Sequence, residues 1–173
     1  MADTFVECLV SRQTPAYAAP LKIGLIAVAC IFFALGIFNP LLWIVTVIVV
    51  VAGLFIIPGL NVEYEYTFIA DQLNVDKIVN RSKRKKVAEY MMSRVDVIAP
   101  VDSREIMGYA QNPNNRIKPL DFTSGTADNS AIYGMIYNGE KGKIVAYFEP
   151  NEKLIKALKA QSPNKVTINS VAL

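Results

Sequence analysis

The most constraining feature of the chain is a long apolar run without charged residues near its amino terminus. No charged side chain occurs from Ile23 to Val62. Because the hydrocarbon core of a bilayer is about 30 Å thick, a spanning helix needs roughly 20 apolar residues. The run is long enough for two such helices, and Phe38-Asn39-Pro40 interrupts it near the middle. We predict antiparallel helices over Leu21–Phe38 and Leu41–Ile57, joined by this tight turn as a membrane hairpin.

A cleaved signal peptide is the alternative interpretation of the first apolar stretch. Signal peptides have a basic start, a short apolar core and a small-x-small cleavage site. The residues before the run carry Arg12 and Lys22 against Asp3 and Glu7, and no cleavage site separates the two predicted helices. We therefore favour an uncleaved hairpin.

The positions of basic residues predict how the hairpin is oriented. Lysine and arginine are enriched on the cytoplasmic side of membrane proteins. The turn between the helices is uncharged, whereas Arg12 and Lys22 precede the first helix and a basic cluster follows the second. We predict a protein of the cell membrane (inner or plasma membrane) with two spans and both termini in the cytoplasm, so that the lipid bilayer is its first partner.

Composition divides the chain into three segments. Residues 1–20 are predicted to be a cytoplasmic amino-terminal segment, residues 21–60 the hairpin, and residues 61–173 a cytoplasmic domain that carries most of the charge. In the first segment, Thr4-Phe5-Val6-Glu7 matches a helix capping box, and apolar residues follow at helical spacing. An amphipathic helix on the inner leaflet and a short strand docked on the cytoplasmic domain both fit, with the helix slightly favoured.

An alternation of apolar and polar residues begins directly after the hairpin. It runs from Val62 to Phe68 and predicts a half-buried strand. Three further short strands are predicted at Leu73–Val79, Val87–Met91 and Arg94–Ala99, separated by tight turns. Consecutive strands with such short connections form an antiparallel meander.

The second half of the cytoplasmic domain combines a long loop, a hairpin and a helix. Val101–Pro119 is polar and is predicted to be mainly loop, and a brief strand is predicted at Leu120–Thr123. Two aromatic-rich strands follow at Ala131–Tyr137 and Lys143–Phe148, joined by a glycine-containing turn. An amphipathic helix then begins at Asn151 and ends at Ser162-Pro163.

Seven predicted strands in hairpin order, closed by one amphipathic helix, form the element order of the pleckstrin-homology superfold. More narrowly, the chain resembles a small bacterial family of two-span membrane proteins with a pleckstrin-homology-like cytoplasmic domain. The motifs that carry this resemblance are Phe5-Val6-Glu7, Asn61-Val62-Glu63-Tyr64-Glu65-Tyr66, Lys83-Arg84-Lys85-Lys86, Ile98-Ala99-Pro100 and Phe148-Glu149-Pro150-Asn151-Glu152. The resemblance implies an α+β membrane protein, in which an antiparallel β-barrel or sheet closed by a carboxyl-terminal helix follows the transmembrane hairpin. It implies no activity.

The sequence departs from the superfold members that bind phosphoinositides. Those members place lysine and arginine around the first hairpin of the domain. Here that turn is Ala70-Asp71-Gln72, and the strand before it carries Glu63 and Glu65. We therefore transfer no binding residue from them.

A basic cluster is the most distinctive feature of the cytoplasmic domain, and it consists of Arg81, Lys83, Arg84, Lys85 and Lys86. The first strand leaves the membrane at about Val62 and the second returns over the same distance, at roughly 3.3 Å per residue. The turn that follows should therefore lie at the membrane surface. We predict contact with anionic lipid headgroups, worth about 1 kcal/mol per charge. A solvated turn that merely follows the positive-inside pattern is the equally weighted alternative.

The composition argues against an enzyme. The chain has no histidine, no Cys-x-x-Cys pair, no glycine-rich phosphate loop and no G-x-S-x-G motif. Asp96, Asp102 and Glu105 are the densest group of carboxylates, and helix capping and a polar strand face account for them. We predict no catalytic residue, no metal site and no cofactor. Nucleic acid is not an expected partner, because Tyr90 is the only aromatic residue near the basic cluster.

The sequence therefore predicts a non-catalytic interaction or assembly module tethered to the membrane. It would bind a protein partner, anionic headgroups at the inner leaflet, or both, and small residues in the spans allow self-association. We expect Val101–Pro119 to be the specificity surface, and an open strand edge could bind a partner peptide. The alternative function is a subunit of a small oligomeric channel or transporter, which would need oligomerisation because the apolar run has no ionisable residue to mark a pathway.

Overall fold

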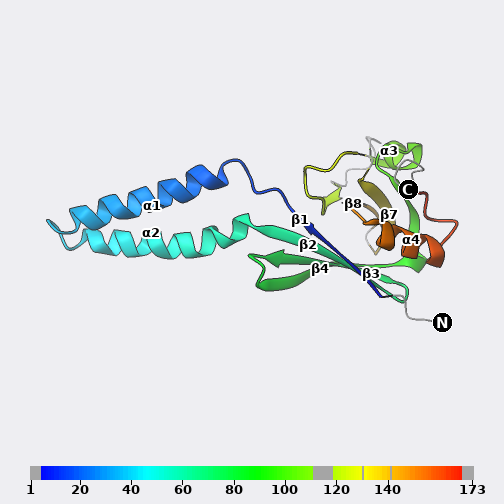
Figure 1. Ribbon diagram of the computed structural model, residues 1–173, viewed down its shortest axis with the longest axis horizontal. Coiled ribbons are helices and arrows are strands. Elements are labelled where there is room, and N and C mark those ends of the chain that lie inside the picture. Colours follow the sequence, from blue (N-terminus) through cyan, green and yellow to red (C-terminus); the bar gives the residue numbers. More distant parts are fainter. Residues whose placement is uncertain (1–4, 111–118, 130, 141, 169–173) are drawn as a thin grey trace. The chain divides into compact units, whose positions relative to one another are not determined.

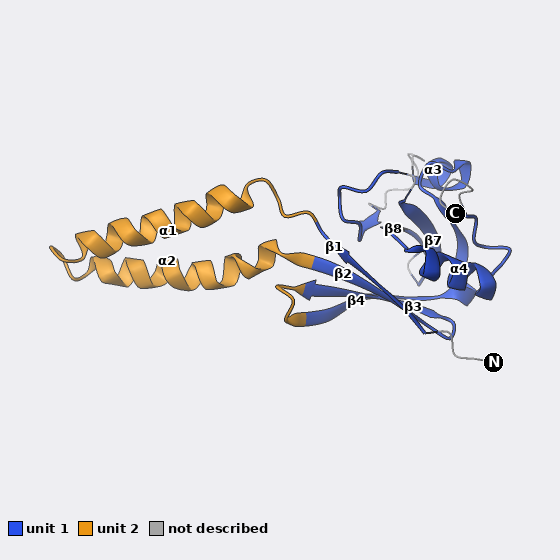
Figure 2. Ribbon diagram, in the orientation of Figure 1, with its two compact units in different colours: residues 1–12, 63–78, 84–173 blue, residues 13–62, 79–83 orange. Residues whose placement is uncertain are grey.

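The computed structural model describes residues 5–110, 119–129, 131–140 and 142–168 (Figure 1). The chain forms two compact units (Figure 2). Unit 2 comprises residues 13–62 and 79–83, and unit 1 comprises residues 1–12, 63–78 and 84–173. This division rests on compactness, so the predicted limits of the membrane segment, residues 21–60, stay a prediction.

The predicted pair of apolar helices is confirmed in unit 2. They are α1 (Ala18–Leu35) and α2 (Leu42–Ile56), and α2 continues into a short 3-10 helix, η1 (Pro58–Leu60). By length and composition, both can cross a membrane. Only 6% of each apolar stretch is buried, whereas the core helix of a soluble protein would be mostly covered. Their exposed apolar surface fits a lipid environment.

A glycine and a tryptophan hold the two helices together where they meet. A Cβ atom at Gly36 would lie 1.9 Å from Cδ1 of Trp43, so only glycine leaves room for the indole. The indole stacks on Phe33, with ring centroids 6.3 Å apart. Its Nε1–H donates to the Phe33 carbonyl oxygen at 3.3 Å. This contact supports the tight connection that the sequence predicts.

The first sheet has the strand order β1-β2-β3-β4. These strands are β1 (Val6–Ser11), β2 (Val62–Ile69), β3 (Gln72–Val79) and β4 (Lys83–Met91). The part of the amino-terminal segment from Val6 to Ser11 is thus a strand, and the amphipathic helix favoured there is wrong. Its side chains alternate, with Cys8 buried between exposed neighbours. The strand pairs antiparallel with β2, from Val6 opposite Phe68 to Ser11 opposite Glu63.

The pairing of β1 with β2 makes the helical hairpin an insertion between two neighbouring strands. The chain leaves the sheet at Ser11 and re-enters it at Val62. Residues 1–12 accordingly belong to the same compact unit as residues 84–173. Because the sheet is antiparallel here, the end where β1 stops is also the end where β2 starts.

The second sheet has the strand order β5-β7-β8-β6. Its strands are β5 (Val95–Pro100), β6 (Leu120–Asp121), β7 (Tyr133–Gly139) and β8 (Gly142–Phe148). The predicted hairpin is confirmed as β7 and β8, which pair antiparallel from Tyr133 opposite Phe148 to Gly139 opposite Gly142. The short strand β6 runs parallel to β8.

The predicted four-stranded meander is wrong at its last strand. A 3-10 turn, η2 (Met92–Arg94), with Met92 buried, ends β4, and β5 then pairs with β7. Val95, Ile98 and Ala99 are almost fully buried. A strand that is buried to this extent needs hydrogen-bond partners for its backbone. β7 pairs with β5, and Val166 forms a further bridge with Ile98.

Aromatic pairs fill the space between the two sheets. Ring centroids lie 5.5 Å apart for Tyr64 and Phe122 and 5.8 Å apart for Tyr66 and Phe148. The Tyr66 hydroxyl donates to the Phe122 carbonyl oxygen at 2.6 Å, and burial raises the pKa of this tyrosine. The sequence allowed either a closed barrel or an open sheet. The strands form two separate sheets, so a closed barrel is not formed.

Two helices cover the sheets of unit 1. The predicted carboxyl-terminal helix is confirmed as α4 (Glu152–Gln161), where Asn151 accepts a hydrogen bond from the Leu154 N–H at 2.8 Å. Helix α3 (Arg104–Ala110) lies on β7, where the absence of a side chain at Gly134 makes room for Ile106. Both helices bury apolar faces, as amphipathic helices do.

Candidate membrane-surface site

The basic cluster begins in the turn between β3 and β4. Asn80 and Arg81 have φ of 52° and 54°, in the left-handed region that asparagine tolerates best. The Asn80 N–H donates to the Asn61 carbonyl oxygen at 2.9 Å. This turn, residues 79–83, belongs to the same compact unit as the helical hairpin. The hydrogen bond therefore ties the turn to the residue that directly follows η1.

Arg84 and Lys86 of the cluster form ion pairs within the protein. Arg84 Nη2 lies 2.5 Å from Glu65 Oε2, and Lys86 Nζ lies 2.5 Å from Glu89 Oε2. The Glu65 side chain is 10% exposed, whereas that of Arg84 is 56% exposed. The Glu65 oxygen is buried and has no well-aligned hydrogen-bond donor, so its contact with Arg84 is mainly electrostatic. Arg84 thus provides the charge that a nearly buried carboxylate needs.

Both ion-paired cations lie on the outer face of the first sheet. They line a shallow groove of about 520 Å³ together with residues from three other parts of the sheet. The full lining is Phe5, Glu7, Thr67, Ile69, Asn74, Asp76, Arg84 and Lys86. Carboxylates and cations are therefore mixed on this face.

The other lysines of β4 point away from the groove. Since side chains alternate along a strand, Lys83 and Lys85 lie on the opposite side from Arg84 and Lys86. The same alternation on β3 puts Lys77 on the side of the buried residues Leu73 and Val75. The sequence-based prediction did not include Lys77, because this residue lies outside the basic run. Its spacing of two from Val75 could have indicated that both side chains share one face of the strand.

Of the acidic residues singled out by the sequence, Asp96 forms contacts that serve the structure. Asp96 accepts hydrogen bonds from Lys143, at 2.7 Å, and from Asn138, at 2.5 Å. The hydrogen bond from Lys143 is the main cause that lowers the pKa of Asp96. Ser103 accepts a hydrogen bond from the Ile106 N–H at the start of α3. Among the residues that the structure describes, no group of acidic residues and cysteines could hold a metal ion.

The predicted specificity loop, Val101–Pro119, contains α3, and its residues 111–118 lie outside the described part of the chain. A second groove of about 400 Å³ opens beside α3. Burial raises the pKa of Tyr147 on its wall. The groove is lined by Val101, Asp102, Met107, Ala110, Pro119, Asn129 and Tyr147.

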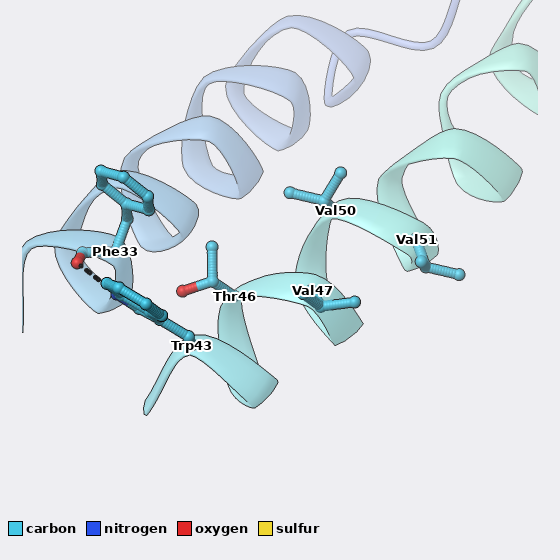
Figure 3. Close-up of a pocket in the computed structure, with 6 residues that line it drawn as sticks. All are labelled: Phe33, Trp43, Thr46, Val47, Val50 and Val51. Carbon is cyan, nitrogen blue, oxygen red and sulfur yellow. Dashed lines mark hydrogen bonds between the residues drawn. The ribbon is translucent and has the colours of Figure 1, made fainter. Parts of the chain in front are cut away.

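The helical hairpin has a hollow of its own, of about 370 Å³ (Figure 3). Among the described residues that line it, three are valines and Thr46 alone has a hydroxyl group. The Thr46 hydroxyl donates to the Leu42 carbonyl oxygen at 3.3 Å, within its own helix. The hollow therefore offers apolar contact and no charged group. Its lining is Phe33, Trp43, Thr46, Val47, Val50 and Val51.

Comparison with known families identifies the fold. A family model described as "Bacterial PH-like domain (DUF6106)" matches residues 2–168. The chain belongs to this family. The match runs from β1 through the hairpin to the end of the second sheet and α4, and it confirms the resemblance that the motifs of the sequence indicate. Comparisons with curated proteins and with solved structures gave no match.

Proposed function

We propose that this PH-like protein is a non-catalytic interaction module tethered to the membrane. Its basic turn binds anionic lipid headgroups at the inner leaflet, and its cytoplasmic domain is thereby held in one orientation for a protein partner. PH-like domains commonly bind lipids or proteins. The fold alone does not choose between these ligands, whereas the position and charge of the turn favour headgroups.

The hydrogen bond from Asn80 to Asn61 is the observation that carries the proposal. The second apolar stretch ends at Leu60, so Asn61 follows directly where the chain would leave the hydrocarbon. A turn bonded to Asn61 then lies at headgroup depth. Arg81 and Lys83 belong to this turn, and each charge near an anionic surface contributes about 1 kcal/mol. The attraction decays over about 8 Å in physiological salt.

The short connections between the hairpin and the first sheet support the same proposal. Asn61 alone separates η1 from β2, and β1 ends shortly before α1 begins. Two adjacent, hydrogen-bonded strands therefore continue from the two helices. Such short connections limit how far the domain can move from the end of the hairpin, in contrast to a long flexible linker.

The channel or transporter alternative lacks comparable support. Ionisable residues within a membrane usually mark a path for ions or solutes. The hollow on the hairpin is lined by apolar residues and by Thr46, whose hydroxyl is already bonded. We therefore retain the interaction module as the conclusion.

Hydrogen exchange in nanodiscs tests the lipid part of the proposal. The full chain is reconstituted in phosphatidylcholine alone and in equal parts of phosphatidylcholine and phosphatidylglycerol. We expect amide exchange in residues 79–86 to slow in the anionic discs and to recover when salt is added, because surface attraction is screened. Exchange that is the same in both discs would contradict headgroup binding.

Crosslinking in native membranes, followed by purification and mass spectrometry, tests the partner part. A stoichiometric second protein is the expected result. Recovery of self-crosslinked chains alone would contradict the adaptor role and favour a homo-oligomer. Solute flux through reconstituted vesicles would then decide whether that oligomer is a pore.

A further inference from the structure

Strand alternation separates the basic cluster into two chemically different sets. Arg84 and Lys86 share the outer face of the first sheet with Asp76, and both are paired with carboxylates. These cations are already neutralised by the protein. An ion-paired charge attracts a phosphate less than an unpaired one does, because the neighbouring carboxylate repels the phosphate.

The opposite face of the same strands carries Lys77 and Lys85, and the carboxylate that alternation along β4 adds to it, Glu89, is paired with Lys86. Lys77 on β3 follows the buried Leu73 and Val75 at the period of two, and Lys85 on β4 lies on the side away from the groove. On this face β2 presents tyrosines and a phenylalanine, and β3 presents apolar residues before Lys77. In the described part of the chain, neither Lys77 nor Lys85 forms an ion pair.

Both lysines lie near the end of the sheet that leads to the hairpin. Lys77 precedes the last residue of β3 by two positions, and Lys85 follows the first residue of β4 by two. At about 3.3 Å per residue, each Cα is roughly 7 Å from its strand end. Since the strands are antiparallel, this is the end at which β1 stops and β2 starts.

We propose that Lys77 and Lys85 bind the phosphate groups of anionic lipids, whereas Arg84 and Lys86 neutralise carboxylates of the protein itself. The inference rests on the proposed function and deepens it by dividing the cluster and adding Lys77. A lysine ammonium group binds phosphate as a compact point charge. Its methylene stem can lie along an apolar face while the charge reaches the headgroups.

Lysine footprinting of the full chain in nanodiscs tests the division directly. The acetylation rate of each lysine is measured by mass spectrometry in phosphatidylcholine discs and in discs with equal phosphatidylglycerol. We expect acetylation of Lys77 and Lys85 to slow about fivefold in the anionic discs, from the typical strength of lysine attraction to such surfaces. Lys86, on the outer face, and Lys153, on α4, are the matched controls and should change by less than about twofold.

The outcomes separate this inference from the proposed function. If Lys86 slows as much as Lys85, the division is wrong while headgroup binding stands. If no lysine slows, both proposals fail. If inorganic phosphate added to phosphatidylcholine discs protects Lys77 and Lys85 equally well, the site binds a soluble anion and the lipid assignment is overturned.

A pair of variants provides a second readout that does not depend on chemical labelling. Lys77→Gln with Lys85→Gln removes the proposed headgroup contacts, and Lys86→Gln is the control. We expect the first variant to lose the phosphatidylglycerol-dependent protection of residues 79–83 and the control to keep it. Retained protection in the first variant would overturn the inference. If Lys85 on the edge strand β4 only prevents pairing with other strands, the first variant would give that result.

Discussion

Replacing Arg84 by alanine tests whether this member of the basic cluster has a structural task. The substitution leaves the Glu65 carboxylate, with a side chain that is 10% exposed, without its cation. A hydrogen bond to a charged group contributes about 1.5–3 kcal/mol. The Arg84 side chain is 56% exposed and the contact lacks a well-aligned donor, so water compensates part of the loss. We expect Arg84→Ala to lower the free energy of unfolding by about 1–2 kcal/mol.

The assay is urea unfolding of the full chain in micelles, followed by near-ultraviolet circular dichroism. Buried tyrosines of unit 1, such as Tyr66 and Tyr90, report on its packing. Lys85→Ala is the matched control, because it removes a neighbouring cation without an ion-pair partner. A surface change of this kind should alter the free energy of unfolding by no more than about 0.5 kcal/mol.

A double-mutant cycle identifies the cause of the loss. Glu65→Gln removes the buried charge and should make the protein insensitive to loss of Arg84, so the coupling energy should equal the effect of Arg84→Ala, about 1–2 kcal/mol. Equal effects of Arg84→Ala and Lys85→Ala, or a coupling energy near zero, would refute the assignment of Arg84 to Glu65.

Two further predictions concern unit 1. Gly134→Ala should lower the free energy of unfolding by about 1–3 kcal/mol, since the new Cβ would lie 2.6 Å from Cγ2 of the buried Ile106. Gly108→Ala, with open space around it, should be neutral or stabilising in the same urea titration. Lys143→Met should make the midpoint temperature of unfolding depend less on pH in the acidic range. The lowered pKa of Asp96 gives stability above the ordinary carboxyl pKa of about 4, and this stability is lost as the pH falls through the lowered value. An unchanged pH dependence in the acidic range would contradict that contact.

The features that could be predicted from the sequence are those set by local pattern. The apolar run ending at Val62 defines both helices, and the alternation after it defines β2 and β3. The hairpin of β7 and β8 and the capped helix α4 likewise follow from short-range signals.

The features that could not be predicted depend on contacts between distant residues. The strand β1 carries spacing that fits a helix as well as a strand, and its partner β2 lies beyond the whole helical hairpin. β5 has the pattern of a fourth meander strand, and its pairing with β7, a strand distant in the sequence, shows that the chain changes sheets.

The candidate site divides in the same way. The run from Lys83 to Lys86 is visible as one basic cluster, yet a strand sends alternate members to opposite faces. The pairing of Arg84 with Glu65 crosses the sheet and leaves no mark in the local sequence. Lys77 gains significance only when β3 and β4 are seen as neighbours.

Cysteine labelling in intact cells tests the central claim, that a hairpin inserted between β1 and β2 anchors a cytoplasmic PH-like domain. After Cys8→Ala and Cys30→Ala, single cysteines are introduced as Ser11→Cys, Asn39→Cys or Glu152→Cys. A membrane-impermeant maleimide should label Asn39→Cys in intact cells and the other two variants only after lysis. Labelling of Ser11→Cys or Glu152→Cys in intact cells, or protection of Asn39→Cys until lysis, would contradict the account.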